Sequence, residues 1–338
     1  MAVSQQELEA RYAEAASAGA ARFLRAKHVP DALAKLGLIG PQDHLVVCAD
    51  DFQDAFIERF PRESLFFLSE PSVDAFAAAP VAAGEGRTFW FVNSIGGRGL
   101  RVPDMRSLAK AAHAADAYLL VDNTVPSAFG CRPLELDADA CFEALDRVAG
   151  GKLAQKAVAV AWRKKSNPLL QTNYAERPKI GGQLKPQLGY SAYFAEALAG
   201  DVAVIAAGLD SLSVRMQHHF DRARAIAEYL SCCDAVPSVA YPGLAPHPDH
   251  ALAANVLRHG YGPSVDFELP ASVSAAAFIA RCALDGREHP AGGACTRLSA
   301  RDGDEARFIR LFAGLDDPLA IADDLDQALR WFCNPPEP

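Results

Sequence analysis

The stretch from Thr88 to Thr124 reads TFWFVNSIGGRGLRVPDMRSLAKAAHAADAYLLVDNT and contains the repeating unit of the fold. Its two apolar runs, 88–92 and 118–121, have the length and the aromatic or branched content of buried strands. Between them, Asp104 is placed to cap a helix whose apolar face is formed by Met105, Leu108, Ala112 and Ala115. A strand, a helix and a strand in this order predict a βαβ unit with two parallel strands.

The same alternation surrounds this unit on both sides. Short apolar runs at 44–48, 64–68 and 157–162 predict three more buried strands. Repetition of the βαβ unit predicts a mostly parallel sheet that is covered by helices on both faces. The first half of the chain is therefore expected to belong to the α/β class.

After residue 201 the pattern changes to a long helix followed by mixed elements. Apolar residues recur at three- and four-residue steps over 202–230, which is typical of one long helix. The elements expected after it are a helix to His259, a strand at 265–269, a helix to about Ala283, a strand at 308–311 and a closing helix from Pro318 to near Trp331. We therefore expect a large α/β domain over residues 1–201 and a smaller α+β domain over 202–338.

Composition excludes several classes of function. The 338 residues carry 33 Lys and Arg against 42 Asp and Glu, and this acidic balance predicts no nucleic-acid partner. No apolar run reaches about 18 residues, so no membrane span is expected. The first twenty residues lack the features of a signal peptide, which favours a cytoplasmic location with reduced cysteines. His247, Asp249 and His250 lie in a proline-rich turn, so we expect no metal site there.

The segment Ala117-Tyr-Leu-Leu-Val-Asp-Asn-Thr124 places Asp122 at the end of a predicted strand, where parallel sheets position ligand-binding groups. It resembles the pyridoxal phosphate (PLP)-dependent cystathionine γ-synthase and γ-lyase family of trans-sulfuration enzymes. The resemblance continues through Gly208-Leu-Asp-Ser-Leu212, Tyr241-Pro-Gly-Leu244 and Ile309-Arg-Leu311. It implies a fold-type I, PLP-transferase-like fold, in which Asp122 pairs with the protonated pyridine nitrogen and Arg310 holds the substrate carboxylate.

The chain departs from this family at the residues that would hold the cofactor covalently. Arg147 stands at the position of the lysine that forms the Schiff base, and a guanidinium does not form an imine. The two hydroxyl donors that bind the cofactor phosphate in the family are replaced by Ala144 and Asp146. Asp146 places a negative charge where a phosphate would lie, so the resemblance implies PLP but these residues predict that its binding is lost.

Other positions that contact cofactor or substrate in the family have also changed. Gln53 stands at the position of the tyrosine that stacks on the pyridine ring, and Gly97 replaces the asparagine that binds the substrate carboxylate. The phosphate-binding glycine at a helix N-terminus corresponds to Ala26, next to Lys27. Arg147 and Gln53 thus stand at candidate catalytic positions, but they lack the lysine amine and the tyrosine ring that the family uses there.

Three functions follow from these residues. The leading hypothesis is a catalytically inactive pseudoenzyme with a structural or regulatory role, as a homodimer or as a heteromer with an active relative. The first alternative is an active PLP-dependent C–S lyase or γ-replacement enzyme that uses Lys152 or Lys156 as its amine. The second is a protein that binds a small carboxylate or phosphate in the old cofactor cleft through Arg147, Lys152 and Arg310.

Overall fold

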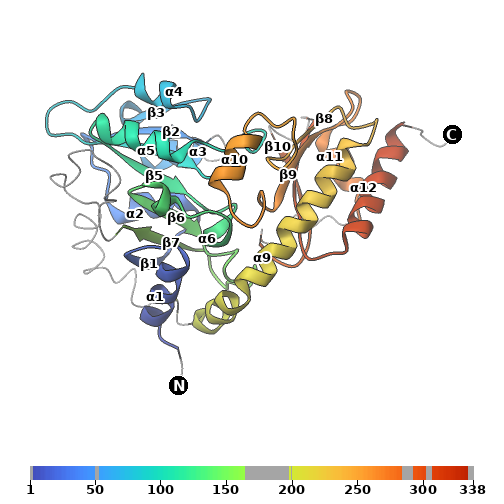
Figure 1. The fold of residues 1–338 in the computed structure, drawn as a ribbon, viewed down its shortest axis with the longest axis horizontal. Helices are drawn as coiled ribbons and strands as arrows, with labels where there is room; N and C mark the ends of the chain where they lie inside the picture. The colour runs from blue at the N-terminus through green and yellow to red at the C-terminus, as the bar shows by residue number, and fades with distance from the viewer. Residues whose placement is uncertain are drawn as a thin grey trace.

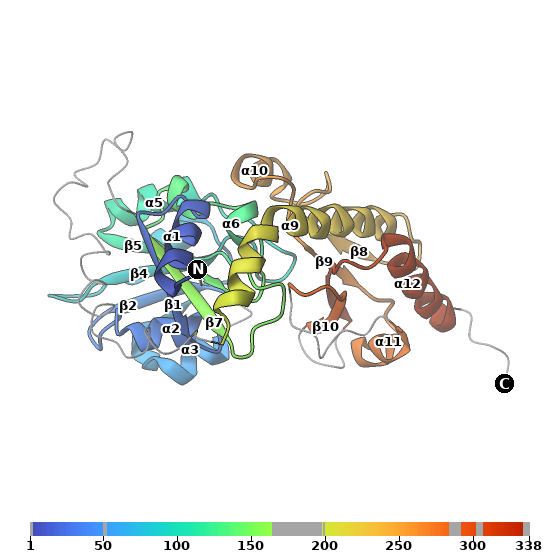
Figure 2. The same ribbon diagram turned by 90° about the horizontal axis from the view of Figure 1, so that it is seen from below.

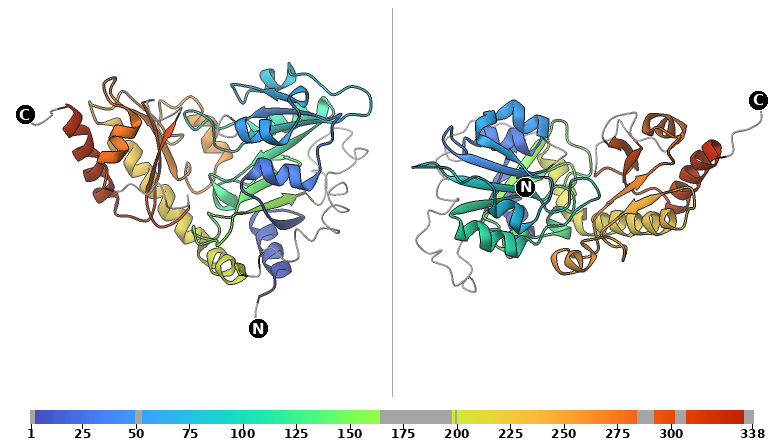
Figure 3. Two further views of the ribbon diagram at one scale, coloured as in Figure 1. Left: turned by 180° about the vertical axis from the view of Figure 1, so that it is seen from behind. Right: turned by 90° about the horizontal axis from the view of Figure 1, so that it is seen from above.

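The described residues fold around two β-sheets, one in each half of the sequence (Figure 1). The computed structural model describes residues 3–49, 53–163, 198, 200–283, 292–301 and 307–333. The 30-residue helix α9 (Val202–Ser231) runs from the first sheet to the second, as Figure 3 shows from two sides. Helix α9 therefore connects the two sheets.

The first sheet has seven strands in the order β1-β7-β6-β5-β4-β2-β3. Strands β2 to β6 pair in parallel, and β7 runs antiparallel between β1 and β6. The strands are β1 (Ala20–Arg25), β2 (His44–Cys48), β3 (Leu65–Phe67), β4 (Thr88–Asn93), β5 (Ala117–Asp122), β6 (Ala140–Ala144) and β7 (Ala157–Trp162). The predicted mostly parallel sheet is confirmed, and its register places Asn93 on β4 opposite Asp122 on β5.

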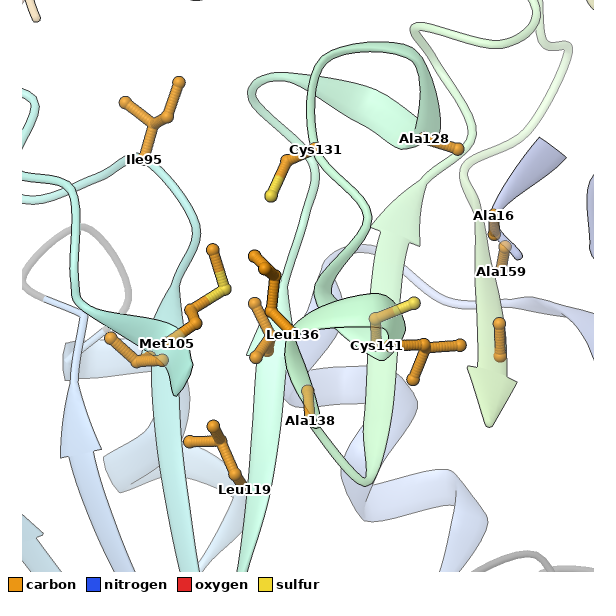
Figure 4. Close-up of a cluster of buried hydrophobic side chains, with 14 of the residues drawn as sticks. Ala16, Ile95, Met105, Leu119, Ala128, Cys131, Leu136, Ala138, Cys141 and Ala159 are labelled. Carbon is orange, nitrogen blue, oxygen red and sulfur yellow. The ribbon is translucent and has the colours of Figure 1, made fainter. Parts of the chain in front are cut away.

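Helices cover both faces of this sheet. Figure 2 shows α1 (Gln5–Ala15) and α5 (Met105–Ala114) on one face, and α2 (Val29–Leu36) and α3 (Gln53–Arg59) on the other. Successive side chains of β5 alternate between the two cores: Leu119 packs beneath α5 and Leu120 packs with the α2 side. Figure 4 shows the first core, in which Met105 lies near Leu119. Burial on both faces explains why the strands read as unbroken apolar runs.

The second sheet is antiparallel, with the strand order β10-β11-β9-β8. Its strands are β8 (Ser238–Ala240), β9 (Ser264–Glu268), β10 (Arg297–Arg301) and β11 (Phe308–Phe312). Helices α9, α11 (Ala275–Arg281) and α12 (Pro318–Cys333) enclose a separate core that includes Ile226, Phe267, Phe278 and Leu325. The predicted α+β character of the second half is confirmed.

Several element boundaries differ from those expected. Strands β1 and β10 contain too much alanine and arginine to stand out as apolar runs, and β6 is interrupted by Glu143. Helix α10 (His250–Val256) ends before the predicted His259, because Leu257 has extended backbone angles. Other short elements among the described residues are α4 (Val73–Ala77), α6 (Ser127–Gly130) and the 3-10 helices at Arg62–Ser64 and Pro133–Leu136. In the part of the chain described, no helix is long and apolar enough to cross a membrane.

Helix α9 approaches the loop after β6 closely at Gly208. A Cβ atom built on Gly208 would lie 2.0 Å from the carbonyl oxygen of Val148. We therefore expect Gly208→Ala to lower the free energy of unfolding by about 1–3 kcal/mol, although alanine normally favours a helix interior. Urea denaturation measures the change, and Gly200→Ala is the control, because a Cβ on Gly200 would meet nothing within 4 Å. A Gly208→Ala chain as stable as Gly200→Ala would contradict the close contact.

Candidate functional site

The Asp-Asn-Thr segment at the end of β5 connects this strand to β6. Asp122 is 3% exposed, and its Oδ1 accepts a hydrogen bond from the backbone N–H of Thr124 at 2.8 Å. The Thr124 hydroxyl oxygen accepts one from the N–H of Ala144 at 2.9 Å. The side-chain amide of Asn123 donates to the carbonyl of Cys131 at 2.9 Å. Asp122 thus lies at the carboxyl end of its strand, as expected, and the three residues together brace that end.

Arg147 lies in the loop that follows β6 and is only 8% exposed. Its guanidinium carbon is 5.2 Å from the centre of the Phe312 ring, which belongs to the second sheet. Burial lowers the pKa of Arg147, and the negative charges of Asp146, Asp122 and Glu143 oppose that effect. The structure therefore brings Arg147 into the electrostatic neighbourhood of Asp146, Asp122 and Glu143.

Contacts from two other segments fix the backbone at Arg147. The Arg215 guanidinium on α9 donates to the carbonyl of Arg147 at 2.6 Å and to that of Val148 at 2.9 Å. Gly292 packs so closely that a Cβ there would lie 2.7 Å from the Cα of Arg147. Gly292 also has φ +92°, which favours glycine. The loop is therefore clamped between α9 and the segment that precedes β10.

The two lysines that could replace the missing amine have different surroundings. The Nζ of Lys156 lies 2.8 Å from the Oδ1 of Asp146, so this ammonium is already ion-paired. Lys152 is exposed. Asp146 itself is 7% exposed, whereas the side chain of Lys156 is 51% exposed, and Asp146 stands at one of the positions where the family has a phosphate donor.

The N-terminus of α2, where the resemblance places the phosphate-binding glycine, carries its own carboxylate. The Oδ2 of Asp31 accepts from the backbone N–H of Lys27 at 3.0 Å and lies 3.0 Å from the Nζ of Lys35. The N–H of Asp31 donates to the Nδ1 of His28 at 3.1 Å. Burial raises the pKa of Asp31, but these hydrogen bonds and nearby cations outweigh burial and lower it. The Asp31 carboxylate therefore accepts a backbone N–H that a bound phosphate would need at this helix N-terminus.

Arg310 pairs with another residue of the second sheet. Its Nε and Nη2 lie 2.6 and 2.7 Å from the two carboxylate oxygens of Asp266, which is opposite Arg310 in the β9–β11 register. The same Nη2 donates to the carbonyl of Gly97 at 2.7 Å. The guanidinium that the resemblance assigns to the substrate carboxylate thus binds an internal carboxylate.

Gln53 is exposed at the start of α3. The three residues before it lie outside the described part of the chain. The candidate positions consequently separate into a buried group around Asp122, Asp146 and Arg147, a second group formed by Arg310 and Gly97, and the exposed Gln53. In the described ranges, no group of three or more His, Cys, Asp or Glu side chains gathers to hold a metal.

Sequence reasoning missed Glu143, a fully buried carboxyl group on β6. Its Oε2 accepts from the Tyr12 hydroxyl of α1 at 2.7 Å and from the N–H of Ala128 at 3.0 Å. Burial raises the pKa of Glu143 to about 8, although these two hydrogen bonds oppose the rise. A glutamate between Phe142 and Ala144 in a strand was the available signal, because an acidic side chain is rarely buried without partners.

These residues do not fit PLP held as an imine. Arg147 offers a guanidinium in place of the amine, and Ala144 and Asp146 offer no hydroxyl donor to a phosphate. Of these described positions, only Asp122 keeps the chemistry of the family, a carboxylate that would stabilise a protonated pyridine nitrogen.

Comparisons with known proteins agree with the residues and with the fold. A family model described as Cys/Met metabolism PLP-dependent enzyme matches residues 43–330. Cystathionine gamma-synthase of Mycobacterium tuberculosis is 30% identical over 314 residues, which cover 86% of this chain and 75% of the relative. Cystathionine gamma-lyase of Bos taurus is 29% identical over 316 residues, which cover 86% and 73%.

A solved structure shows the same fold at lower identity. The cystathione gamma lyase from Micromonospora echinospora superposes with a TM-score of 0.78 at 23% identity, over 96% of this chain and 86% of that chain. Together, the family match over most of the chain and the identity to curated relatives show that this chain belongs to the PLP-dependent enzyme family of cysteine and methionine metabolism.

Proposed function

We propose that this chain is a catalytically inactive member of its family, with a structural or regulatory role. The observation that carries the proposal is Arg147, a buried guanidinium at the position of the Schiff-base lysine. An arginine stays protonated at any working pH and is not a nucleophile toward an aldehyde. On this proposal, the chain does not form the Schiff base on which the family's chemistry depends.

The charges around Arg147 support a site that is complete without a cofactor. Its guanidinium lies in the field of Asp122, so the chain supplies its own cation near the carboxylate that would face a pyridinium. Phe312 and Gly292 cover Arg147 from the second half of the chain. On this proposal the former reaction centre now holds the two sheets together.

The two alternatives have less support from the geometry. An active enzyme would need Lys156 to leave Asp146, or the exposed Lys152 to reach the site. An anion site that uses Arg310 would have to displace Asp266 from both guanidinium contacts. We further propose that domains 1–201 and 202–338 act as one cytoplasmic unit, either as a homodimer or as a heteromer with an active relative.

The test is the absorbance spectrum of the purified protein, followed by PLP addition, borohydride reduction and peptide mass mapping. We expect no imine absorbance and no phosphopyridoxyl-lysine in the natural chain. Arg147→Lys is the matched variant, because a reduced adduct at residue 147 in this variant alone would assign the loss to that position. An adduct on Lys152 or Lys156 of the natural chain would contradict the proposal and support the active-enzyme alternative.

A further inference from the structure

The loop that follows β4, residues 96–102, contacts a turn in the second half of the chain just before α10. Arg101 uses its Nε and Nη2 to hold the two carboxylate oxygens of Asp249, at 2.6 and 3.0 Å. The same carboxylate accepts a hydrogen bond from the backbone N–H of Val102 at 2.9 Å. Asp249 is 8% exposed, so water competes little for these contacts. One carboxylate therefore joins this loop to the second half of the chain.

His247 contacts both the loop and Asp249. Its Nε2 lies 2.8 Å from the carbonyl oxygen of Gly99, and its Nδ1 lies 3.1 Å from the backbone nitrogen of Asp249. A carbonyl oxygen only accepts and a backbone N–H only donates, so Nε2 carries the ring proton and Nδ1 accepts. Both ring nitrogens are therefore used by the neutral imidazole, and neither contact requires a charge.

The backbone of the loop adopts a conformation that needs support. Leu100 has φ +55°, in the left-handed region that a leucine rarely adopts, and it is fully buried. Gly97 and Gly99 on either side also have positive φ, of +62° and +79°. Contacts from the second half of the chain thus help to hold a strained segment, and we expect it to relax when they are lost.

Charged groups surround His247. Among the described residues, the titratable and charged groups that face His247 or its partners come from its own segment, from the loop, from the residues after β3 and from the second sheet: Asp249, His250, Arg101, Glu70, Asp266 and Arg310. Burial, with the charges of Arg101 and His250, lowers the pKa of His247 from its ordinary value of 6.5. The Gly99 carbonyl and Asp249 oppose that effect without cancelling it.

The direction of this shift sets the effect of pH on the contact. Because the pKa is lowered, His247 holds a proton less tightly here than it does when it is released from the loop. The contact is therefore fully present above about pH 6.5 and is weakened as the pH falls below that value. Burial raises the pKa of Asp249, but the hydrogen bonds from Arg101 and Val102 outweigh burial and lower it, so this carboxylate stays ionised in mild acid.

We propose that residues 96–102 and 247–249 form a pH-sensitive latch between the two halves of the chain, which neutral His247 closes and protonated His247 opens. A proton on Nδ1 faces the backbone N–H of Asp249, so two donors meet where one hydrogen bond was. The new imidazolium also attracts the Asp249 carboxylate and competes with Arg101 for it. One proton thus weakens several contacts of the loop at once.

Opening the latch also affects a pocket at the carboxyl end of β4. The pocket has a volume of about 280 Å³, and the loop supplies four of its lining residues: Gly96, Gly97, Arg98 and Arg101. Release of the loop therefore changes the wall of this pocket as well as the contact between the two halves. The proposal goes beyond catalytic inactivity, since it holds whether or not the chain forms a PLP adduct.

Hydrogen exchange measured by mass spectrometry at pH 7.5, 6.5 and 5.5 tests the latch. After correction for the intrinsic effect of pH on exchange, we expect peptides covering 97–102 to lose protection about fivefold between pH 7.5 and 5.5, which is the loss of one hydrogen bond. Peptides from α5 should keep their protection, because that helix packs on the first sheet. Unchanged protection of 97–102, or an equal loss in α5, would overturn the proposal.

Variants assign the effect to one histidine. Gln at position 247 keeps an N–H donor for the carbonyl of Gly99 but does not titrate, so His247→Gln should remove the pH dependence of protection in 97–102. His250→Gln is the matched control and should retain it, because the Nδ1 of His250 contacts the carbonyl of Pro242 and not the loop. A pH dependence that persists in His247→Gln, or that disappears only in His250→Gln, would contradict the latch.

A measurement on the natural chain checks the geometry independently of any variant. Nitrogen-15 chemical shifts of the His247 ring, assigned through its backbone, distinguish the two neutral tautomers. At pH 7.5 we expect the proton on Nε2 and a free lone pair on Nδ1 that accepts from Asp249. A ring that carries its proton on Nδ1, or that is already charged at pH 7.5, would overturn the proposal.

Discussion

Replacement of Arg310 by methionine is expected to destabilise the chain by about 3–5 kcal/mol. The side chains of Arg310 and Asp266 are 13% and 6% exposed, so the substitution leaves a buried carboxylate without its main cation. It also removes the hydrogen bond to the carbonyl of Gly97 and thus one contact between the two halves of the chain. Urea denaturation followed by circular dichroism measures the loss.

Two further variants make this prediction specific. Arg307→Met removes a guanidinium from the same segment, but its partner Glu268 and Arg307 itself are 19% and 40% exposed, so we expect a loss below about 1 kcal/mol. Adding Asp266→Asn to Arg310→Met should recover part of the stability, because the uncompensated charge is removed. A cost for Arg310→Met no larger than that for Arg307→Met would mean that the buried pair stabilises the chain no more than the more exposed pair does.

Glu143→Gln is expected to stabilise the chain increasingly as the pH rises from about 4.5 to about 8. The folded state raises the pKa of Glu143 from 4.5 to about 8, so it holds the proton more tightly than the unfolded chain does. Stability that this carboxyl group contributes is therefore fully present below pH 4.5 and is lost as the pH rises through the folded-state pKa. Glutamine keeps an acceptor for Tyr12 but has no proton to lose, and the difference above pH 8 should be on the order of 4 kcal/mol.

The measurement is the urea midpoint of natural chain and variant at several pH values from 4.5 to 9. Glu135→Gln is the matched control with the opposite sign. Burial raises the pKa of Glu135, but Ser17, Arg258 and Arg132 outweigh burial and lower it. That glutamate therefore stabilises the folded chain above its unfolded-state pKa, and Glu135→Gln should destabilise at neutral pH. If the urea midpoints of the natural chain and Glu143→Gln differed by the same amount at every pH, the predicted shift in the pKa of Glu143 would be wrong.

The strands and helices with continuous apolar patterns were predictable from the sequence. The runs that became β2, β4, β5 and β7 are buried on both faces, and the Asp104 side chain caps α5 through the N–H of Ser107. Strand β6 was missed because Glu143 interrupts its apolar pattern. Hydrophobic periodicity does not reveal that the Tyr12 hydroxyl, on the distant helix α1, donates a hydrogen bond to this carboxyl group.

Only part of the candidate site could be predicted from the sequence. The type of residue at position 147 excludes an imine whatever its surroundings, because reactivity of a guanidinium is a property of the side chain itself. The partners of Arg310, Lys156 and Arg101 lie far away in sequence or across a loop, at Asp266, Asp146 and Asp249. Ion pairs of this kind depend on distances that only strand register and loop closure set.

The sequence by itself determined the fold class, since hydrophobic periodicity is a local property, and its resemblance to known enzymes indicated the family and the replacement of the lysine. Only the tertiary structure decided which charges are neutralised inside the molecule. Arg310 is bound by Asp266, and Arg101 is bound by Asp249. The physical reason is that pairing and burial arise from contacts between segments far apart in the chain, and a one-dimensional pattern does not contain those distances.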